Sequence, residues 1–212
     1  MAQAAVSVPT STTFVNRALV LLGDAPVSSL TDGSAQAAIV STFYDSAFEE
    51  FIGSTGWRWA MRTAVPARHS LGGNYVVPAD PQYLFQYTLP SDFLTLYRVE
   101  QTCTHEIALV PGDLTANTTN LIRAIWSTVA LDRIHYVAKV GEECLPPHAQ
   151  EAFVYKLAHI LAIPVQSNRA RSEYFYGLYM KSLRRAQAID ARQRPTASIV
   201  ENGRLAVEWD QI

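Results

Sequence analysis

The first third of the chain carries apolar side chains at helical spacing in two separate segments. The spacing predicts one helix over residues 12–22, with Gly23 as its left-handed C-cap. A second, longer helix is predicted from a cap at Asp32 or Ser34 to about Thr55. One face of the first helix is predicted to be buried: Phe14, Val15, Ala18, Leu19 and Leu22.

The apolar stripe of the second helix is wider than burial on one side requires. A surface helix needs about a third of its circumference apolar, and here Phe48 and Ile52 lie beyond the main stripe. The width indicates burial against two neighbours, either within the fold or across a subunit interface. Phe48 and Ile52 are therefore the candidate residues for a subunit interface.

From residue 68 to residue 141 the pattern changes to short runs rich in β-branched and aromatic residues, separated by glycine and proline. Such runs between turn residues are typical of strands joined by tight connections. We expect a small antiparallel β lobe here. Its predicted strands are residues 83–89, 93–101, 106–110, 119–126 and 133–140.

Helical spacing returns after Pro146-Pro147. The first helix of this part should stop or kink at Pro164, because proline removes a backbone donor and clashes with the preceding turn. Asn168 can cap the last helix, and Pro195 should end it. The predicted inward stripe of the last helix is Phe175, Leu178, Tyr179, Leu183, Ala186 and Ile189.

The predicted fold class is therefore α+β. A helical bundle is formed from both chain ends, with an inserted small antiparallel β lobe and a C-terminal extension. The predicted parts are residues 1–67 and 142–195 for the bundle, 68–141 for the β lobe and 196–212 for the extension.

Composition narrows the class of protein. The 212 residues are 49% hydrophobic, which excludes a largely disordered chain. No apolar run approaches the roughly 20 residues of a membrane span, and the N-terminus lacks the features of a secretory signal, so no membrane partner is expected. The two cysteines, Cys103 and Cys144, are too few for a disulfide framework and suit a reducing cytoplasm, where we expect synthesis.

Charge is unevenly distributed, although the net charge is only −2. Residues 168–194 hold seven basic and two acidic side chains, a net charge of +5, which leaves −7 for the remainder. Such segregation is used by complementary surfaces to set register with a partner or with another copy of the chain.

Candidate chemistry is sparse. Cys103-x-His105 and Cys144-x3-His148 can together supply four zinc ligands, but structural zinc sites favour a close Cys-x2-Cys pair, so ordinary cysteines are the alternative we favour. The sequence has no nucleophile elbow and no phosphate-binding loop. Adjacent acids such as Glu49-Glu50 diverge by about 100° on a helix and do not converge as a catalytic pair. We therefore expect no enzyme activity, no metal and no cofactor.

Two features point to contacts with other molecules. On a helical wheel four basic residues of the last helix share a face: Lys181, Arg184, Arg185 and Arg192. This face is a solvated surface, a contact with acidic residues of a neighbouring subunit, or a contact with DNA phosphates. The extension is too short to fold alone, since an isolated hairpin is marginal in water. It either packs back on its own bundle or binds a partner by strand pairing or groove insertion. Its candidate partner-binding residues are Ile199, Val200, Arg204, Leu205, Val207 and Trp209.

Several stretches, in order along residues 12–192, resemble the tail tubular protein A family, the head-to-tail adaptors of podoviruses. Residues 16–23 match its N-x-A-L-x-x-L-G helix, and Tyr44-Asp45 matches a Tyr-Asp pair in the long helix that follows. GWRWAMRTA is similar to the family's W-x-F-A segment, with Trp59 in place of the usual Phe. QYTLPSDFLTLYRVE resembles its Y-x-L-P-x-D segment, and FVYKLAHILA followed by a helix ending in RRAQAIDARQ resembles its closing pair of helices.

The resemblance implies a structural role in the neck of a virion, assembled in the host cytoplasm. It implies a ring of about twelve copies that joins the portal protein to a tail nozzle protein, with genomic DNA passing through the channel in non-specific contact. It also implies that a C-terminal extension reaches the portal, although the matching residues end before 196–212. A DNA-binding packaging or regulatory protein and an enzyme of another type are the alternatives.

Overall fold

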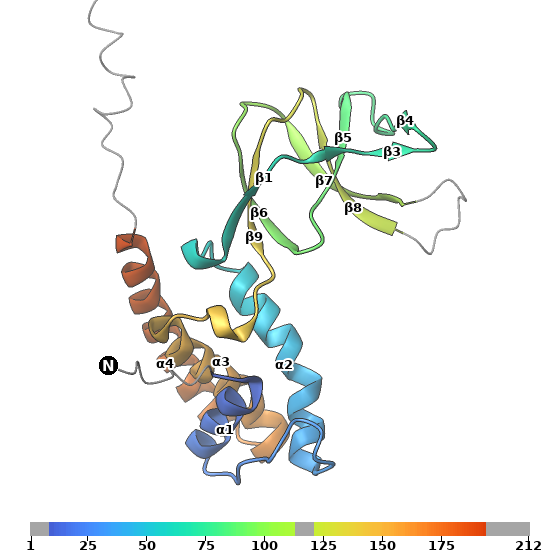
Figure 1. Ribbon diagram of the computed structural model, residues 1–212. Coiled ribbons are helices and arrows are strands. Elements are labelled where there is room, and N and C mark those ends of the chain that lie inside the picture. Colours follow the sequence, from blue (N-terminus) through green and yellow to red (C-terminus); the bar gives the residue numbers. More distant parts are fainter. Residues whose placement is uncertain (1–8, 113–120, 194–212) are drawn as a thin grey trace, which may run out of the picture.

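The computed structural model describes residues 9–112 and 121–193, which form an α+β fold with a helical lobe and a β lobe (Figure 1). N-terminal and C-terminal helices pack together, and the antiparallel sheets come from the middle of the chain, as predicted. The α-helices of the described residues are α1 (Ser11–Leu22), α2 (Ala35–Gly53), α3 (Pro147–Gln166) and α4 (Arg169–Arg192).

The helix ends follow the sequence signals. Gly23 adopts the left-handed conformation at φ 79° and closes α1. Ser34 Oγ accepts a hydrogen bond from the Ala37 amide at 3.1 Å, and Asn168 Oδ1 accepts one from the Arg171 amide at 3.0 Å, so both predicted caps are confirmed.

Helix α3 was predicted to stop or kink at Pro164; it does not stop there, because the helix continues to Gln166. Only two helical residues follow the proline, so its missing amide removes one hydrogen bond from the final turn alone. The helix then ends at Ser167, which has the left-handed φ of 51°. That residue reverses the chain into α4.

The β lobe contains two main sheets, with strand orders β1-β9-β6 and β2-β5-β8-β7, and a separate β3-β4 hairpin; every pairing is antiparallel. The five predicted strands are confirmed, and four short ones were missed. A 3-10 turn, η2 (Glu142–Cys144), leads from the last strand to α3. The strands are β1 (Met61–Ala64), β2 (Ala67–Arg68), β3 (Ser70–Leu71), β4 (Asn74–Tyr75), β5 (Phe85–Thr88), β6 (Phe93–Val99), β7 (His105–Pro111), β8 (Leu121–Ser127) and β9 (Ile134–Ala138).

Helix α3 is the centre of the helical lobe and packs against α1, α2 and α4. Its Phe153 is fully buried, and its ring lies 5.2–5.8 Å, centre to centre, from four aromatic rings of the N-terminal helices. Edge-on and tilted packing at this separation is favourable beyond the area buried. The two ends of the chain therefore share one core. The four rings belong to Phe14, Tyr44, Phe48 and Phe51.

This packing corrects the assignment of Phe48 and Ile52 to a subunit interface. Ile52 is fully buried and Phe48 is 7% exposed within the chain itself. Helix α2 contacts α3 on one side and strands β6 and β9 on another, so its wide apolar stripe is covered by both lobes of the same molecule.

Polar contacts fix the lobes to each other. Trp57 follows α2 and donates its indole N–H to the Phe51 carbonyl at 3.0 Å. The next residue, Arg58, begins a 3-10 turn, η1 (Arg58–Ala60), and its amide donates to Asp190 Oδ2 at 2.8 Å. Because Asp190 lies near the end of α4, this bond ties the last helix to the start of β1.

Candidate interaction surfaces

The four basic residues predicted to share a face of α4 are all exposed: Lys181, Arg184, Arg185 and Arg192. The opposite side of the helix is held against the bundle by Phe175, Tyr179 and Ala186, which are buried as predicted. None of the four cations forms an ion pair with another described residue. We call these four residues the cationic face.

Arg169, at the start of the same helix, differs from these four cations because it has an acidic partner. Its Nε lies 3.1 Å from Glu173 Oε1, one helical turn away. That pair is exposed and contributes only a few tenths of a kcal/mol, but it neutralises Arg169 locally. The cationic face has no such carboxylate within α4, because its only other acid is the buried Asp190.

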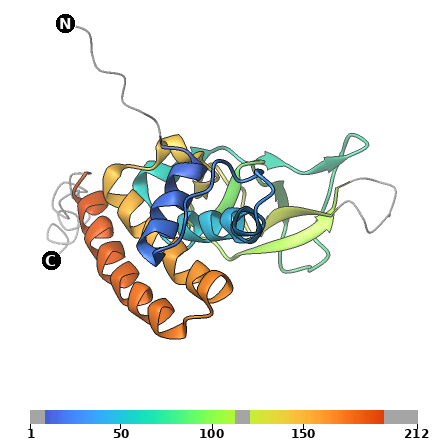
Figure 2. The same cartoon turned by 90° about the horizontal axis from the view of Figure 1, so that it is seen from below.

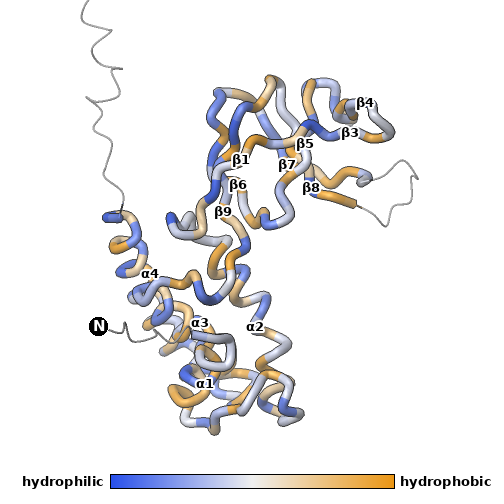
Figure 3. The backbone as a smooth tube through the Cα atoms, in the orientation of Figure 1, coloured by the Kyte–Doolittle hydropathy of each residue, from blue (hydrophilic) through white to orange (hydrophobic). Residues whose placement is uncertain are grey.

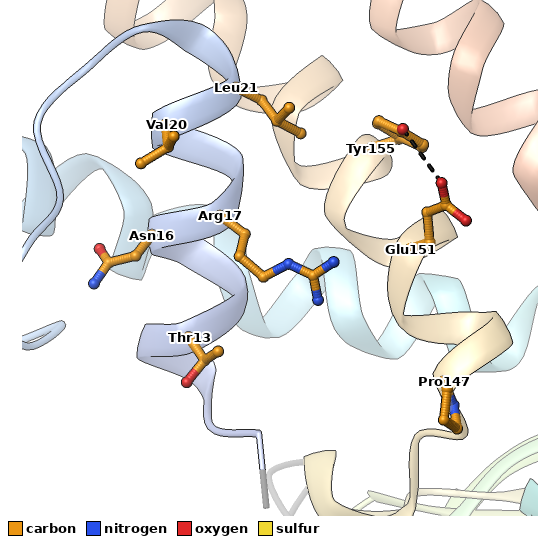
Figure 4. Close-up of a pocket in the computed structure, with 8 residues that line it drawn as sticks. All are labelled: Thr13, Asn16, Arg17, Val20, Leu21, Pro147, Glu151 and Tyr155. Carbon is orange, nitrogen blue, oxygen red and sulfur yellow. Dashed lines mark hydrogen bonds between the residues drawn. The ribbon is translucent and has the colours of Figure 1, made fainter. Parts of the chain in front are cut away.

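A cleft of about 800 Å³ lies between α1 and α3 (Figure 4). Val20 and Leu21 of α1 are 61% and 44% exposed at its rim. Arg17 extends from the same helix toward α3 (Figure 4). The other lining residues are Thr13, Asn16, Pro147, Glu151 and Tyr155.

Glu151 and Tyr155 form the α3 wall of the cleft. The Tyr155 hydroxyl donates to Glu151 Oε1 at 3.3 Å. Partial burial raises the pKa of Tyr155, and the neighbouring Glu151 carboxylate raises it further. The phenol is therefore neutral at physiological pH and fixes one oxygen of Glu151, which leaves the other oxygen available to a cation.

A second hollow, of about 210 Å³, continues from the cleft to the cationic face. It shares Glu151 and Tyr155 with the cleft and is completed by residues of α4, including Lys181 and Arg185. Apolar side chains and cations thus form one continuous surface over three helices. We call it the helical face: Arg17, Val20 and Leu21 of α1, Glu151 and Tyr155 of α3, and Leu178, Lys181 and Arg185 of α4.

The sequence pattern identified only the α4 part of the helical face. A signal for the α1 part was present, because Val20 and Leu21 are apolar yet fall outside the predicted buried stripe of that helix. Such residues are either incidental surface or contacts for another molecule. The juxtaposition of α1 with α4 across α3 depends on the tertiary fold and could not be predicted from helical periodicity.

Two buried polar clusters serve the fold. Ser172 Oγ lies 2.9 Å from His159 Nδ1 and 3.0 Å from the His159 carbonyl oxygen, which joins α4 to α3; Ser172 is 3% exposed. In the β lobe, Gln86 contacts His69 through its side-chain amide and accepts a hydrogen bond from the Trp126 indole at 2.8 Å. The Ser172 hydroxyl, buried between α3 and α4, is unsuited to attack a substrate.

The four candidate zinc ligands are not arranged as one metal site. His105 is the first residue of β7 and Cys103 lies two residues before it, whereas Cys144 ends η2 and His148 lies in the first turn of α3. Among the residues that the structure describes, no group of three or more His, Cys, Asp or Glu side chains is arranged to hold a metal ion.

The candidate partner-binding residues of the extension lie outside the described residues, so their contacts stay a prediction: Ile199, Val200, Arg204, Leu205, Val207 and Trp209. No helix in the described part of the chain combines the length and hydrophobicity needed to cross a membrane.

The sequence matches no protein-family model, and no curated protein matches it.

Proposed function

We propose that this chain is a structural head-to-tail adaptor of a short-tailed phage. Copies form a ring of about twelve that joins the portal protein to the tail nozzle protein in the virion neck, and genomic DNA passes through its channel. The ring is assembled in the host cytoplasm. The observation that carries the proposal is the helical face, which combines exposed apolar side chains with cations that lack a partner among the described residues.

Electrostatics favour an intermolecular use of this face. Exposed cations steer encounters and set register with a complementary surface, while apolar side chains beside them supply the area that excludes water. The rest of the described chain holds carboxylates at its surface, including Glu143 and Asp45. A neighbouring copy in a ring and duplex DNA in a channel are both negatively charged partners that fit the face.

Two of the residues that carry the resemblance, Asn16 and Asp92, make hydrogen bonds that stabilise this fold. Such roles support an architecture shared with the family. Asn16 exchanges two hydrogen bonds with the backbone of Val27, at 2.9 Å and 2.8 Å, and fixes the turn after α1. Asp92, just before β6, accepts a hydrogen bond from the Tyr136 hydroxyl at 2.9 Å and pairs with Arg62 at 2.8 Å. These contacts join the start of β6 to β9 and β1. Residues of this kind preserve a fold rather than a reaction.

The first test mixes the full-length chain with purified portal and measures co-elution and mass. We expect a stable complex whose adaptor content matches the symmetry of the portal. Deletion of residues 196–212 should abolish portal binding and leave a folded protein, because the described residues by themselves bury a large apolar core. If the shortened chain still binds the portal, the extension is not the segment that binds it.

A DNA-binding packaging or regulatory protein is the second candidate, favoured by the exposed cations alone. If the four residues of the cationic face neutralise four phosphates, the slope of log affinity against log salt is roughly −3.6. A ring protein that meets DNA only in its channel binds free duplex weakly. Tight binding of free duplex with the steep slope, without a portal complex, would favour the second candidate.

A further inference from the structure

Strand β7 is an unpaired edge within the described residues. It pairs with β8 without interruption, from His105 opposite Ser127 to Pro111 opposite Leu121, and no described strand lies on its other side. The equally long edge strand β6 has two register irregularities against β9. Such bulges discourage a further strand from pairing, and so do lysines and prolines. Strand β7 has no bulge and no lysine, and its one proline, Pro111, is its last residue. Of these two long edge strands, β7 is therefore the more accessible to an incoming strand.

No segment of the described chain covers the apolar surface of this sheet along β7. Ile125 of β8 is fully buried, whereas its partner Ile107 at the edge is 42% exposed. Leu109 and Leu121 are 66% and 49% exposed, and Figure 3 shows apolar colours along much of the β7–β8 hairpin. Alternate residues of a strand share a face, so Ile107 and Leu109 form an apolar ledge beside the unpaired backbone. An incoming strand would cover both.

The chain itself contains a segment with the matching pattern. Residues 204–210 read Arg-Leu-Ala-Val-Glu-Trp-Asp, in which Leu205, Val207 and Trp209 alternate with polar or small residues. In a strand these three side chains fall on one face. That face would lie beside Ile107 and Leu109, while the charged residues of the segment would point to the opposite face.

The positions of α4 and β7 indicate which copy receives the segment. The end of α4, from which the extension leaves, and the β7–β8 hairpin lie on opposite sides of the molecule in both views (Figures 1 and 2). The β1-β9-β6 sheet lies between them. A donor and a receiver on opposite sides of one subunit make a head-to-tail contact, which closes into a ring when the rotation allows. Residues 194–203 supply a connection of up to about 33 Å when extended.

We propose that residues 204–209 of one copy add as an edge strand to β7 of the next copy. The main-chain hydrogen bonds supply affinity, and the ledge of Ile107 and Leu109 sets the register. The inference rests on the proposed function, because the ring places copies side by side. It gives residues 204–209 a binding site within the ring. Because the portal binds the assembled ring, deletion of the extension is still expected to abolish portal binding.

Two full-length variants test this contact in trans. Leu109→Lys places a charge on the receiving ledge, and Val207→Lys places one on the donated face. Val65→Lys is the matched control, because Val65 is 74% exposed and lies outside β7. Sedimentation velocity over a range of concentrations measures self-association, and thermal melting verifies that each variant is folded.

We expect the wild type and Val65→Lys to self-associate, and each of the other variants to weaken self-association at least tenfold. An equimolar mixture of Leu109→Lys and Val207→Lys should form a one-to-one complex and nothing larger. In that mixture one intact segment meets one intact edge, and the remaining segment and edge both carry a lysine.

Three results overturn the inference. They are a monomeric wild type at the highest soluble concentration, wild-type association by folded Leu109→Lys, and a mixture that fails to form the one-to-one complex. If Val207→Lys loses portal binding while Leu109→Lys self-associates normally, the extension belongs to the portal. A chain that behaves as predicted here but forms no complex with the portal leaves the strand contact intact and removes the adaptor function.

Discussion

Replacement of Phe153 by alanine should remove a large part of the stability of the whole chain. The ring is fully buried and contacts four aromatic rings from both N-terminal helices. Phenylalanine-to-alanine changes in cores cost roughly 3–5 kcal/mol. Because four ring pairs are lost together, we expect the upper end of that range, about 4–5 kcal/mol. Whole domains are stable by only about 5–15 kcal/mol, so the variant should unfold at a much lower urea concentration.

Urea unfolding followed by tryptophan fluorescence measures this loss, since Trp57 is fully buried and packs on Phe51 at 5.3 Å. The matched control is Ile163→Ala, on the same helix but 54% exposed, which should change the free energy of unfolding by less than about 1 kcal/mol. If Phe153→Ala loses no more than the control, the two chain ends do not share the core described here.

Three further predictions concern the junction, the β lobe and the cationic face. Asp190→Ala should lower the free energy of unfolding by about 1–3 kcal/mol, because the Arg58 amide loses its acceptor; an unchanged urea midpoint would contradict this. Burial lowers the pKa of His69, so the unfolded state binds more protons as the pH falls below about 6.5 and stability drops there. The urea midpoint should therefore fall from pH 7.5 to pH 5, and less so in His69→Asn; an equal fall in both would refute the role of His69. Arg184→Glu combined with Arg185→Glu should weaken the portal complex or self-association at least tenfold with an unchanged melting temperature, since both side chains are exposed; full retention of both contacts would count against the cationic face.

Much of the helical lobe could be predicted because its signals are local. Gly23, Ser34 and Asn168 end or begin helices where capping chemistry places them. The long strands were also predictable from their β-branched and aromatic runs. By contrast, β2, β3 and β4 have two residues each, which is too few for an alternating pattern, and β1 follows the η1 turn directly. Register with a distant partner, rather than local preference, makes these segments strands.

The site was predicted only in part, for the same physical reason. The cationic face follows from helical periodicity within one element, and its four residues are exposed as that periodicity requires. The wide stripe of α2 had two explanations, burial by the fold or by another subunit, and only the tertiary packing distinguishes them. Phe48 and Ile52 are buried by the fold of the chain itself. The helical face as a whole depends on three helices brought together by α3.

Electron microscopy of the full-length chain mixed with purified portal tests the adaptor role most directly. Class averages should contain a symmetric ring of density, centred on the portal axis, that is absent from averages of the portal alone. Portal particles that look identical with and without an excess of the chain would contradict it.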